Sequence, residues 1–186
     1  MSKKNYNLLT ASDSCEWDAL VANSPQGSIF CETLFLELCN VNYKRYIIMQ
    51  GDHVKAGISL IVSTDEKTSH LNDLIIYGGL LFNSDKQKKE VRVRYEQFRL
   101  TELATSYLVN HFSRFELVLA PQFEDMRPFL WHEYHNPDPK SRFKLDLRYT
   151  SYVDISSLAS NEVDEKTSAF QRLETLRQRH IREARK

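Results

Sequence analysis

The sequence predicts a mixed α/β domain with a mostly antiparallel central sheet flanked by helices. Short β-rich runs fill the first half of the chain, a long helical stripe follows them, and one more apolar run comes after that stripe. The 186 residues suit one domain of ordinary size. A hydrophobic content of 41% with only five Gly and five Pro excludes collagen-like and broadly disordered chains.

Two helices are predicted before the first strands. Ser12-Asp13-Ser14 offers N-cap oxygens ahead of apolar residues at helical spacing, and Ser24-Pro25-Gln26-Gly27 ends the pattern, so we expect a helix over 14–23. A second short helix over 32–40 would carry Cys39 on its apolar face. Cys39 is therefore expected to be a core thiol.

A hairpin and an interrupted strand come next. The β-rich runs 44–50 and 54–63 are separated by Gly51-Asp52, a dipeptide suited to a tight reversal. A further strand is expected from 70, broken at Gly78-Gly79 and resumed as far as 82. The two glycines indicate a bulge, which is the commoner reason, or a close approach of the backbone to something else.

Helices and strands are also expected to follow one another in the second half of the chain. A continuous apolar stripe at i, i+3, i+4 spacing predicts a helix over 88–112, and a buried strand over 115–120 should follow it. Residues 125–131 are expected to form a short helix or turn, and 144–155 alternates well enough for a strand. Residues 162–186 should close the chain as one helix.

Charge and cysteine content limit the partners and the compartment. The 25 basic and 25 acidic residues give a formal charge of zero, so no global field attracts DNA or an anionic membrane. Three cysteines without a Cys-x-x-Cys pair fit a reducing compartment. The N-terminus lacks a signal core, and no window approaches the about 18 apolar residues of a membrane span. We expect a cytoplasmic protein with no integral membrane segment.

Two familiar catalytic signals are weak here. His132 and His135 are spaced i, i+3, whereas a zincin helix needs i, i+4, so we expect no metal site and interpret both as surface or loop histidines. Cys31 lies at a possible strand-to-helix junction, where a helix dipole would favour a thiolate nucleophile. No histidine can be assigned to it, and a small buried residue is the commoner interpretation.

A candidate ligand site follows the strand predicted over 115–120. Asp125, Arg127 and Trp131 come directly after it, and α/β domains bind ligands beyond the carboxyl ends of their strands. The arginine fork matches anionic oxygens, although at helical spacing Asp125 and Arg127 would not face each other. The basic end of the last helix could also bind phosphate through arginine, but a solvated charged face is the commoner interpretation there.

Three segments, read in order, carry a family resemblance. They are Trp17-Asp18-Ala19-Leu20-Val21-x-x-Ser24-Pro25-x-Gly27-Ser28-Ile29-Phe30, Asp125-x-Arg127-Pro128-Phe129-x-Trp131 and Arg148-Tyr149-Thr150-x-Tyr152-Val153-Asp154. Together they resemble the Fem-like branch (FemAB-related, peptidoglycan-bridge aminoacyl transferases) of the GNAT-type N-acyltransferase superfamily. The final Arg179-His180-Ile181-Arg182-Glu183-Ala184 is similar to the Arg-x-Ile-Arg-x-Ala helix that begins the second domain of that family.

The resemblance implies a fold, an activity and partners. Residues 1–160 would be an N-terminal acyltransferase-like domain and 161–186 the start of a second, missing one, in a fragment or a naturally short relative. The implied reaction is acyl or aminoacyl transfer from acyl-CoA or aminoacyl-tRNA to an amine of a cell-envelope or nucleotide-sugar precursor. A second such domain, or another copy of the chain, would supply much of the donor site, and the usual Gln/Arg-x-x-Gly-x-Gly/Ala donor loop is absent.

The predicted binding residues follow from the motifs and from the reaction. Acyl transfer needs a base for the amine and donors that polarise the carbonyl. Asp125, Tyr149 and Tyr152 can do proton work, but no spacing singles out a catalytic base. The alternative function is a non-catalytic substrate-binding or pairing module with the same fold. The expected substrate-binding set is Asp125, Arg127, Trp131, Tyr149, Tyr152, Arg179 and Arg182.

Overall fold

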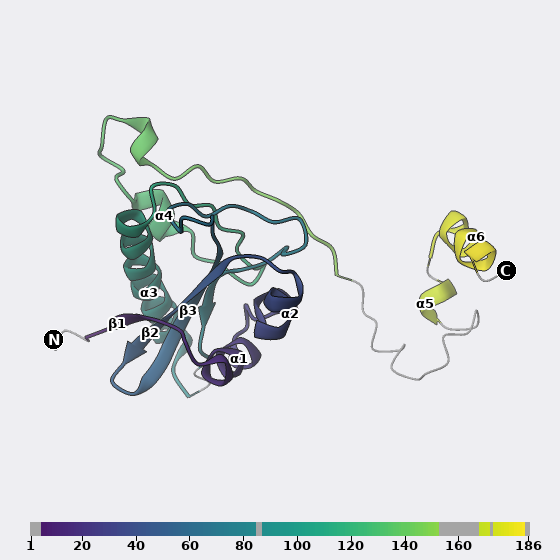
Figure 1. Cartoon of the computed structure of the whole chain (residues 1–186), viewed down its shortest axis with the longest axis horizontal. Helices are drawn as coiled ribbons and strands as arrows, with labels where there is room; N and C mark the ends of the chain where they lie inside the picture. The colour runs from purple at the N-terminus through teal and green to yellow at the C-terminus, as the bar shows by residue number, and fades with distance from the viewer. Residues whose placement is uncertain (1–4, 85–86, 153–167, 172, 185–186) are drawn as a thin grey trace. The chain divides into compact units, whose positions relative to one another are not determined.

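A computed structural model of the chain describes residues 5–84, 87–152, 168–171 and 173–184. It confirms the expected α+β class, because a four-stranded antiparallel sheet in the order β1-β2-β3-β4 has helices on both faces (Figure 1). Its contacts divide the chain into two units, residues 1–145 and 146–186. The domain boundary expected near residue 160 lies outside the described residues.

The sheet contains the predicted hairpin and one strand that was not predicted. β2 and β3 pair in antiparallel fashion across a turn at Gly51, which has a φ of +59°. β1 is short and mostly exposed, so it shows little of the alternation that identifies a strand. The bounds are β1 (Asn7–Thr10), β2 (Tyr43–Gln50), β3 (His53–Ile61) and β4 (Gly79–Phe82).

The helices predicted over 14–23, 32–40 and 88–112 are confirmed. The carboxylate of Asp13 caps the first of them by accepting from the backbone N–H of Cys15 at 2.8 Å and of Glu16 at 3.3 Å. Cys39 lies half-buried beside the small core under the second. The bounds are α1 (Ser14–Asn23), η1 (Ile29–Cys31), α2 (Thr33–Leu38), α3 (Glu90–His111), α4 (Arg127–Trp131) and η2 (Pro139–Ser141).

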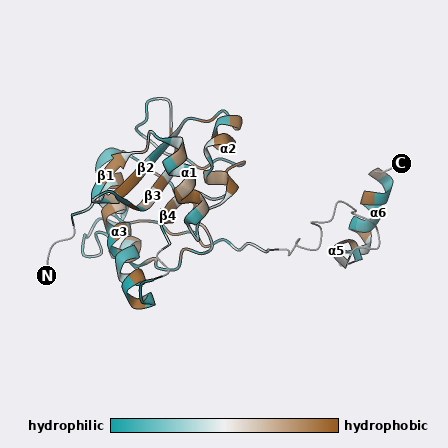
Figure 2. Ribbon diagram, turned by 90° about the horizontal axis from the view of Figure 1, so that it is seen from below, coloured by the Kyte–Doolittle hydropathy of each residue, from teal (hydrophilic) through white to brown (hydrophobic). Residues whose placement is uncertain are grey.

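The core of the first unit has two layers, one on each face of the sheet. α3 covers one face, where Ile48, Ile58 and Leu80 pack with Leu100 and Leu108 and are all fully or almost fully buried. On the other face, the Trp17 ring of α1 is fully buried. In Figure 2 the central strands are largely brown, which marks them as the apolar layer between these helices.

A buried arginine fastens α1 and α2 to this second face. Arg45 of β2 lies 5.5 Å from the Trp17 ring and 5.2 Å from the Tyr43 ring. Its guanidinium donates to the hydroxyl of Thr33, the first residue of α2, and that hydroxyl donates in turn to Asp18 of α1 at 2.9 Å. The charge is thus satisfied inside the domain, and Arg45 has a structural role.

Three strand predictions are wrong. Residues 70–77 form only isolated bridges, and residues 115–120 make a single parallel bridge between Leu119 and Gly78 instead of a ladder. Residues 144–152 form no strand because no neighbouring strand pairs with them, and Leu147 and Tyr149 stay exposed. The remaining residues predicted for that last strand, 153–155, lie outside the described residues.

The closing helix is also not continuous. In the second unit the described residues form α5 (Ser168–Gln171) and α6 (Thr175–Ala184), with a bend between them, whereas one helix over 162–186 was expected. Residues 162–167 lie outside the described residues. Among the described residues, none of the helices is both long and apolar enough to span a membrane.

Candidate functional site

The two glycines predicted to interrupt a strand bring another backbone against β4. The N–H of Gly78 donates to the carbonyl of Val118 at 3.0 Å, which places the segment Phe115–Ala120 parallel to β4. Gly79 has a φ of +71°, and a Cβ there would lie 2.8 Å from the Leu119 side chain. The β3–β4 register runs in step as far as Gly79, so the glycines serve close approach and not a bulge.

A small hollow lies beside this contact, and we call it the strand-break hollow. It is lined by Gly78, Gly79, His70 and Glu116 among others and has a volume of about 30 Å³, room for about one water molecule. The Glu116 backbone is fixed because its N–H donates to the Ser69 hydroxyl at 2.9 Å. The hollow therefore has a carboxylate, that of Glu116, and an imidazole, that of His70, among its lining residues.

Neither titratable group of the hollow was predicted as a site residue from the sequence. His70 was placed at the start of an ordinary strand, and Glu116 inside a buried one. The sequence does contain one sign of this site, because the acidic residue Glu116 interrupts the apolar run from Phe115 to Ala120. A charged residue within a buried strand is a sign that one side of the strand is open.

Further along β4, the side chain of Gln26 lies between the strand and the residues that follow the segment Phe115–Ala120. Its Oε1 accepts from the backbone N–H of Phe82 at 3.2 Å, and its Nε2 donates to the carbonyl of Gln122 at 3.3 Å. Gln26 is only 4% exposed. The Phe82 and Phe123 rings stack beyond it with their centroids 5.8 Å apart. One amide thus makes the hydrogen bonds that a paired strand would make.

The loop that carries Gln26 is held tightly behind α1. The Ser24 hydroxyl donates to Gln26 Oε1 at 3.1 Å. A Cβ on Gly27 would lie 1.9 Å from the Val21 carbonyl oxygen, so only glycine fits there. The Ser24-Pro25-Gln26-Gly27 segment, recognised in the sequence as a helix stop, therefore also positions the amide beside β4.

Asp125 and Arg127 form a bidentate ion pair. Arg127 Nε donates to one carboxylate oxygen of Asp125 at 2.8 Å and Nη2 donates to the other at 2.6 Å. The expectation that they would not face each other is wrong, because Asp125 precedes the first residue of α4 and lacks helical spacing. Hydrogen bonding from Arg127 lowers the pKa of Asp125 below its ordinary value, and the same pair raises the pKa of Arg127.

This pair lies on an aromatic surface. The Arg127 guanidinium is 5.1 Å from the Phe98 ring and 5.6 Å from the Trp131 ring, and Trp131 is 57% exposed. The structure therefore brings together Asp125, Arg127 and Trp131 of the predicted binding set. Their role in binding stays a prediction.

The other predicted binding residues belong to the second unit. Tyr149 and Tyr152 are both exposed. Arg179 pairs with Glu183 on the same helix at 2.8 Å, and the Arg182 guanidinium lies 5.3 Å from the Phe170 ring. The Arg179–Glu183 pair on α6 fits a solvated charged face as well as an anion site.

Cys31 is fully buried, and this burial raises the pKa of its thiol, which opposes the thiolate a nucleophile needs. His132 lies 5.1 Å from the Phe143 ring, and His135 lies beside Tyr134. Among the described residues, no group of three His, Cys, Asp or Glu side chains is placed to hold a metal ion.

Comparison with known proteins adds little to this geometry. No protein-family model and no curated protein matches the sequence. One solved structure, "The crystal structure of a possible acetyltransferase from Clostridium difficile 630", is 12% identical, with a TM-score of 0.37 over 81% of this chain and 98% of that chain. At that score the likeness does not bear on the fold or the function of this chain.

Proposed function

We propose that this chain is the N-terminal part of a Fem-like N-acyltransferase of the GNAT type. The observation that carries the proposal is the strand break, where a single parallel bridge joins Gly78 to Leu119 beside a hollow lined by His70 and Glu116. Backbone N–H groups on a strand edge can polarise an acyl carbonyl, and a carboxylate or imidazole beside them can take the proton of an attacking amine. The Fem-like motifs of the sequence support the same reading.

In this proposal the donor site is completed from outside the first unit. The strand-break hollow of about 30 Å³ is far below the roughly 300–1,000 Å³ of a small-molecule site. Gln26 already occupies the neighbouring stretch of β4. A second acyltransferase-like domain or another copy of the chain would therefore supply most of the contacts to an acyl-CoA or aminoacyl-tRNA donor.

The acceptor is an amine of a cell-envelope or nucleotide-sugar precursor. Its anionic groups would contact the Asp125, Arg127 and Trp131 surface, where a guanidinium lies 5.1 Å and 5.6 Å from two aromatic rings. Tyr149, Tyr152, Arg179 and Arg182 are proposed as further substrate contacts, on the strength of the Fem-like motifs alone. The reaction would take place in the cytoplasm, where both donors are made.

Calorimetric titration of the 186-residue chain with acetyl-CoA and longer acyl-CoAs tests whether donor binding needs a second domain. We expect weak binding or none, and restored binding when a second acyltransferase-like domain is fused to the chain. Micromolar affinity of the chain alone, about −8 kcal/mol, would contradict the need for a second domain. In the fused protein, Glu116→Gln or His70→Asn should lower kcat if the strand break is the reacting centre.

A second candidate function is a non-catalytic substrate-binding or pairing module. The closure of the β4 edge by Gln26 favours it, because an enzyme would keep those amides open for a substrate. The fused protein separates the two candidates. Unchanged turnover in both the Glu116→Gln and His70→Asn variants would place the chemistry elsewhere and support the module.

A further inference from the structure

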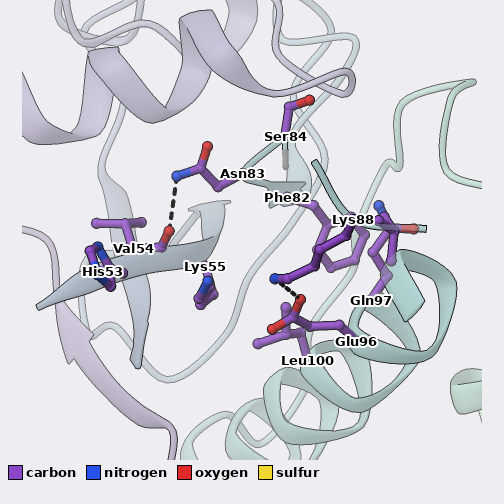
Figure 3. Close-up of a pocket in the computed structure, with 11 residues that line it drawn as sticks. His53, Val54, Lys55, Phe82, Asn83, Ser84, Lys88, Glu96, Gln97 and Leu100 are labelled. Atoms are coloured by element: carbon purple, nitrogen blue, oxygen red, sulfur yellow. Dashed lines mark hydrogen bonds and ion pairs between the residues drawn. The ribbon is translucent and has the colours of Figure 1, made fainter. Parts of the chain in front are cut away.

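A groove lies on the other side of β4, between the start of β3 and the first turns of α3 (Figure 3). We call it the β3–α3 groove. Its volume is about 300 Å³, at the lower end of the range of small-molecule sites. Phe82 and Leu100 contribute apolar surface, and both belong to the buried core below it. The proposed acyl-transfer site uses none of these residues except Phe82.

A β-bulge turns a lysine toward this groove. Ile48 pairs with Ala56 and the next residue, Met49, pairs with Val54, so Lys55 is an extra residue in β3. In a regular strand Lys55 would point to the face opposite to Ala56, which faces α3. The bulge breaks that alternation, and Lys55 lines the groove. Bulges that re-aim a side chain are commonly found beside functional sites.

The end of β4 holds the bulge in place. The backbone N–H of Asn83 donates to the carbonyl of Lys55 at 2.9 Å, and its side-chain amide donates to the carbonyl of Val54, also at 2.9 Å (Figure 3). Both carbonyls displaced from the ladder are thereby satisfied. The position of Lys55 is thus fixed by two hydrogen bonds from one residue.

The charges on the two walls of the groove do not balance. On the α3 wall, Glu96 is bound by the Lys88 ammonium at 2.7 Å and by the Tyr6 hydroxyl at 3.2 Å. On the β3 wall, Lys55 lies next to His53, and no carboxylate among the described residues pairs with Lys55. Lys55 therefore lines a groove that also has the apolar surface of Phe82 and Leu100, and Glu96, the one carboxylate among the described lining residues, is already paired.

We infer that the β3–α3 groove binds a small organic anion. The carboxylate or phosphate head contacts Lys55 and His53, and a short apolar chain lies over Phe82 and Leu100. A cation would be repelled by Lys55, and a neutral ligand would leave its charge unpaired. The inference is independent of acyl transfer, because the groove is lined by other side chains than the strand-break hollow.

Two-dimensional ¹H–¹⁵N NMR titration of the full chain with n-butyl phosphate and with pentanoate tests this, with n-butanol as the uncharged probe. Both anions share the proposed chemistry, and the tighter one identifies the head group. Shifts should concentrate on the amides of Phe82, Asn83 and the first turns of α3. Absence of saturable shifts with either anion, or equal affinity for n-butanol, would overturn the proposal.

Matched variants assign the binding to the bulge. Lys55→Gln should weaken the anion at least about tenfold, the loss expected for a charge-assisted hydrogen bond. Lys140→Gln makes the same charge change on an exposed 3₁₀ turn away from the groove and should leave affinity unchanged within about twofold. Thermal melts should show both variants folded. Equal losses in the two variants would mean that only net charge is sensed, and would overturn the assigned site.

Discussion

The strand-break hollow and the β3–α3 groove lie against the same short strand and differ in almost every other respect. The hollow, at the Gly79 end of β4, has a volume of about 30 Å³, and His70 and Glu116 are among its lining residues. The groove, at the Phe82 end, has a volume of about 300 Å³ and is lined by charged and polar side chains. The edge of β4 that faces the segment Phe115–Ala120 is closed, whereas the groove leaves an opening at the Phe82 end of the strand.

This difference separates stability from binding. On the closed side, substitution of Gly79 or Gln26 should be costly. A Cβ on Gly79 would press on the Leu119 side chain, and the Gln26 amide hydrogen-bonds to Phe82 and to Gln122. On the open side, Lys55 contributes charge but little packing. Substitutions near the hollow should therefore change the free energy of unfolding, and substitutions in the groove should change ligand affinity.

The largest effect is expected from Gly79→Ala, with Gly51→Ala as the control. Both glycines have positive φ, which costs an alanine about 1–2 kcal/mol. A Cβ on Gly51 would meet nothing within 4 Å, whereas one on Gly79 would press on Leu119. Urea unfolding should show a loss of about 1 kcal/mol for Gly51→Ala and about 2–4 kcal/mol for Gly79→Ala. Equal losses would mean that the segment Phe115–Ala120 does not press on β4.

Gln26→Leu should destabilise the domain by about 2–3 kcal/mol, because it leaves the buried Phe82 N–H without its acceptor and also removes the hydrogen bond to the Gln122 carbonyl. Gln50→Leu, at the half-buried end of β2, should change stability by no more than about 0.5 kcal/mol. Chemical denaturation compares the two. If Gln26→Leu is neutral and increases acyl-CoA binding, the amide acts as a removable plug and the edge of β4 is not permanently closed.

The elements that the sequence predicts well are those with a local cause. α1 begins at an N-cap carboxylate, Asp13, and α3 has a continuous apolar stripe, so both are determined by neighbours a few residues away. The failures concern residues 70–77 and 144–152, whose alternation is real but which find no neighbouring strand. A segment forms a strand only when a second segment pairs with it, and the residues within a few positions in the sequence do not show whether that second segment exists.

The site divides in the same way. The Asp125–Arg127 cluster is contiguous in sequence, so it was predicted as a group. Gln26 contacts residues 56 and 96 positions away, and no local pattern reveals such contacts. Lys55 depends on a one-residue insertion in the pairing of β2 with β3, which alternation alone does not detect.

A smaller effect is expected from Tyr6→Phe, which removes a partner of Glu96 in the wall of the groove. Losing the hydrogen bond to Glu96 should cost about 0.5–1.5 kcal/mol. Burial and the Glu96 carboxylate raise the pKa of Tyr6 from 10.0 to about 12, so the neutral phenol stabilises the folded state. That contribution is complete below pH 10 and is lost as the pH rises through about 12.

Absorbance titration at alkaline pH measures this late ionisation. Tyr46 also has a pKa raised to about 12, chiefly by burial, so Tyr6→Phe should remove about half of the late phenolate signal. Tyr95→Phe, which changes an exposed tyrosine on α3, is the control for loss of a hydroxyl. A late signal that is unchanged in Tyr6→Phe would show that Tyr6 is not held against Glu96.

The smallest stability change is expected from Arg127→Ala, compared with Arg114→Ala. Both arginines pair with an acid two positions away and are exposed, so both variants should melt close to the parent. Only Arg127 lies on aromatic rings, so only its loss should weaken an anionic ligand. Arg127 lowers the pKa of Asp125, so the pair stabilises the fold above the ordinary pKa of that carboxyl and less as the pH falls through the lowered value. A marked drop in the melting temperature at neutral pH without loss of ligand binding would make the cluster structural, like the hollow and unlike the groove.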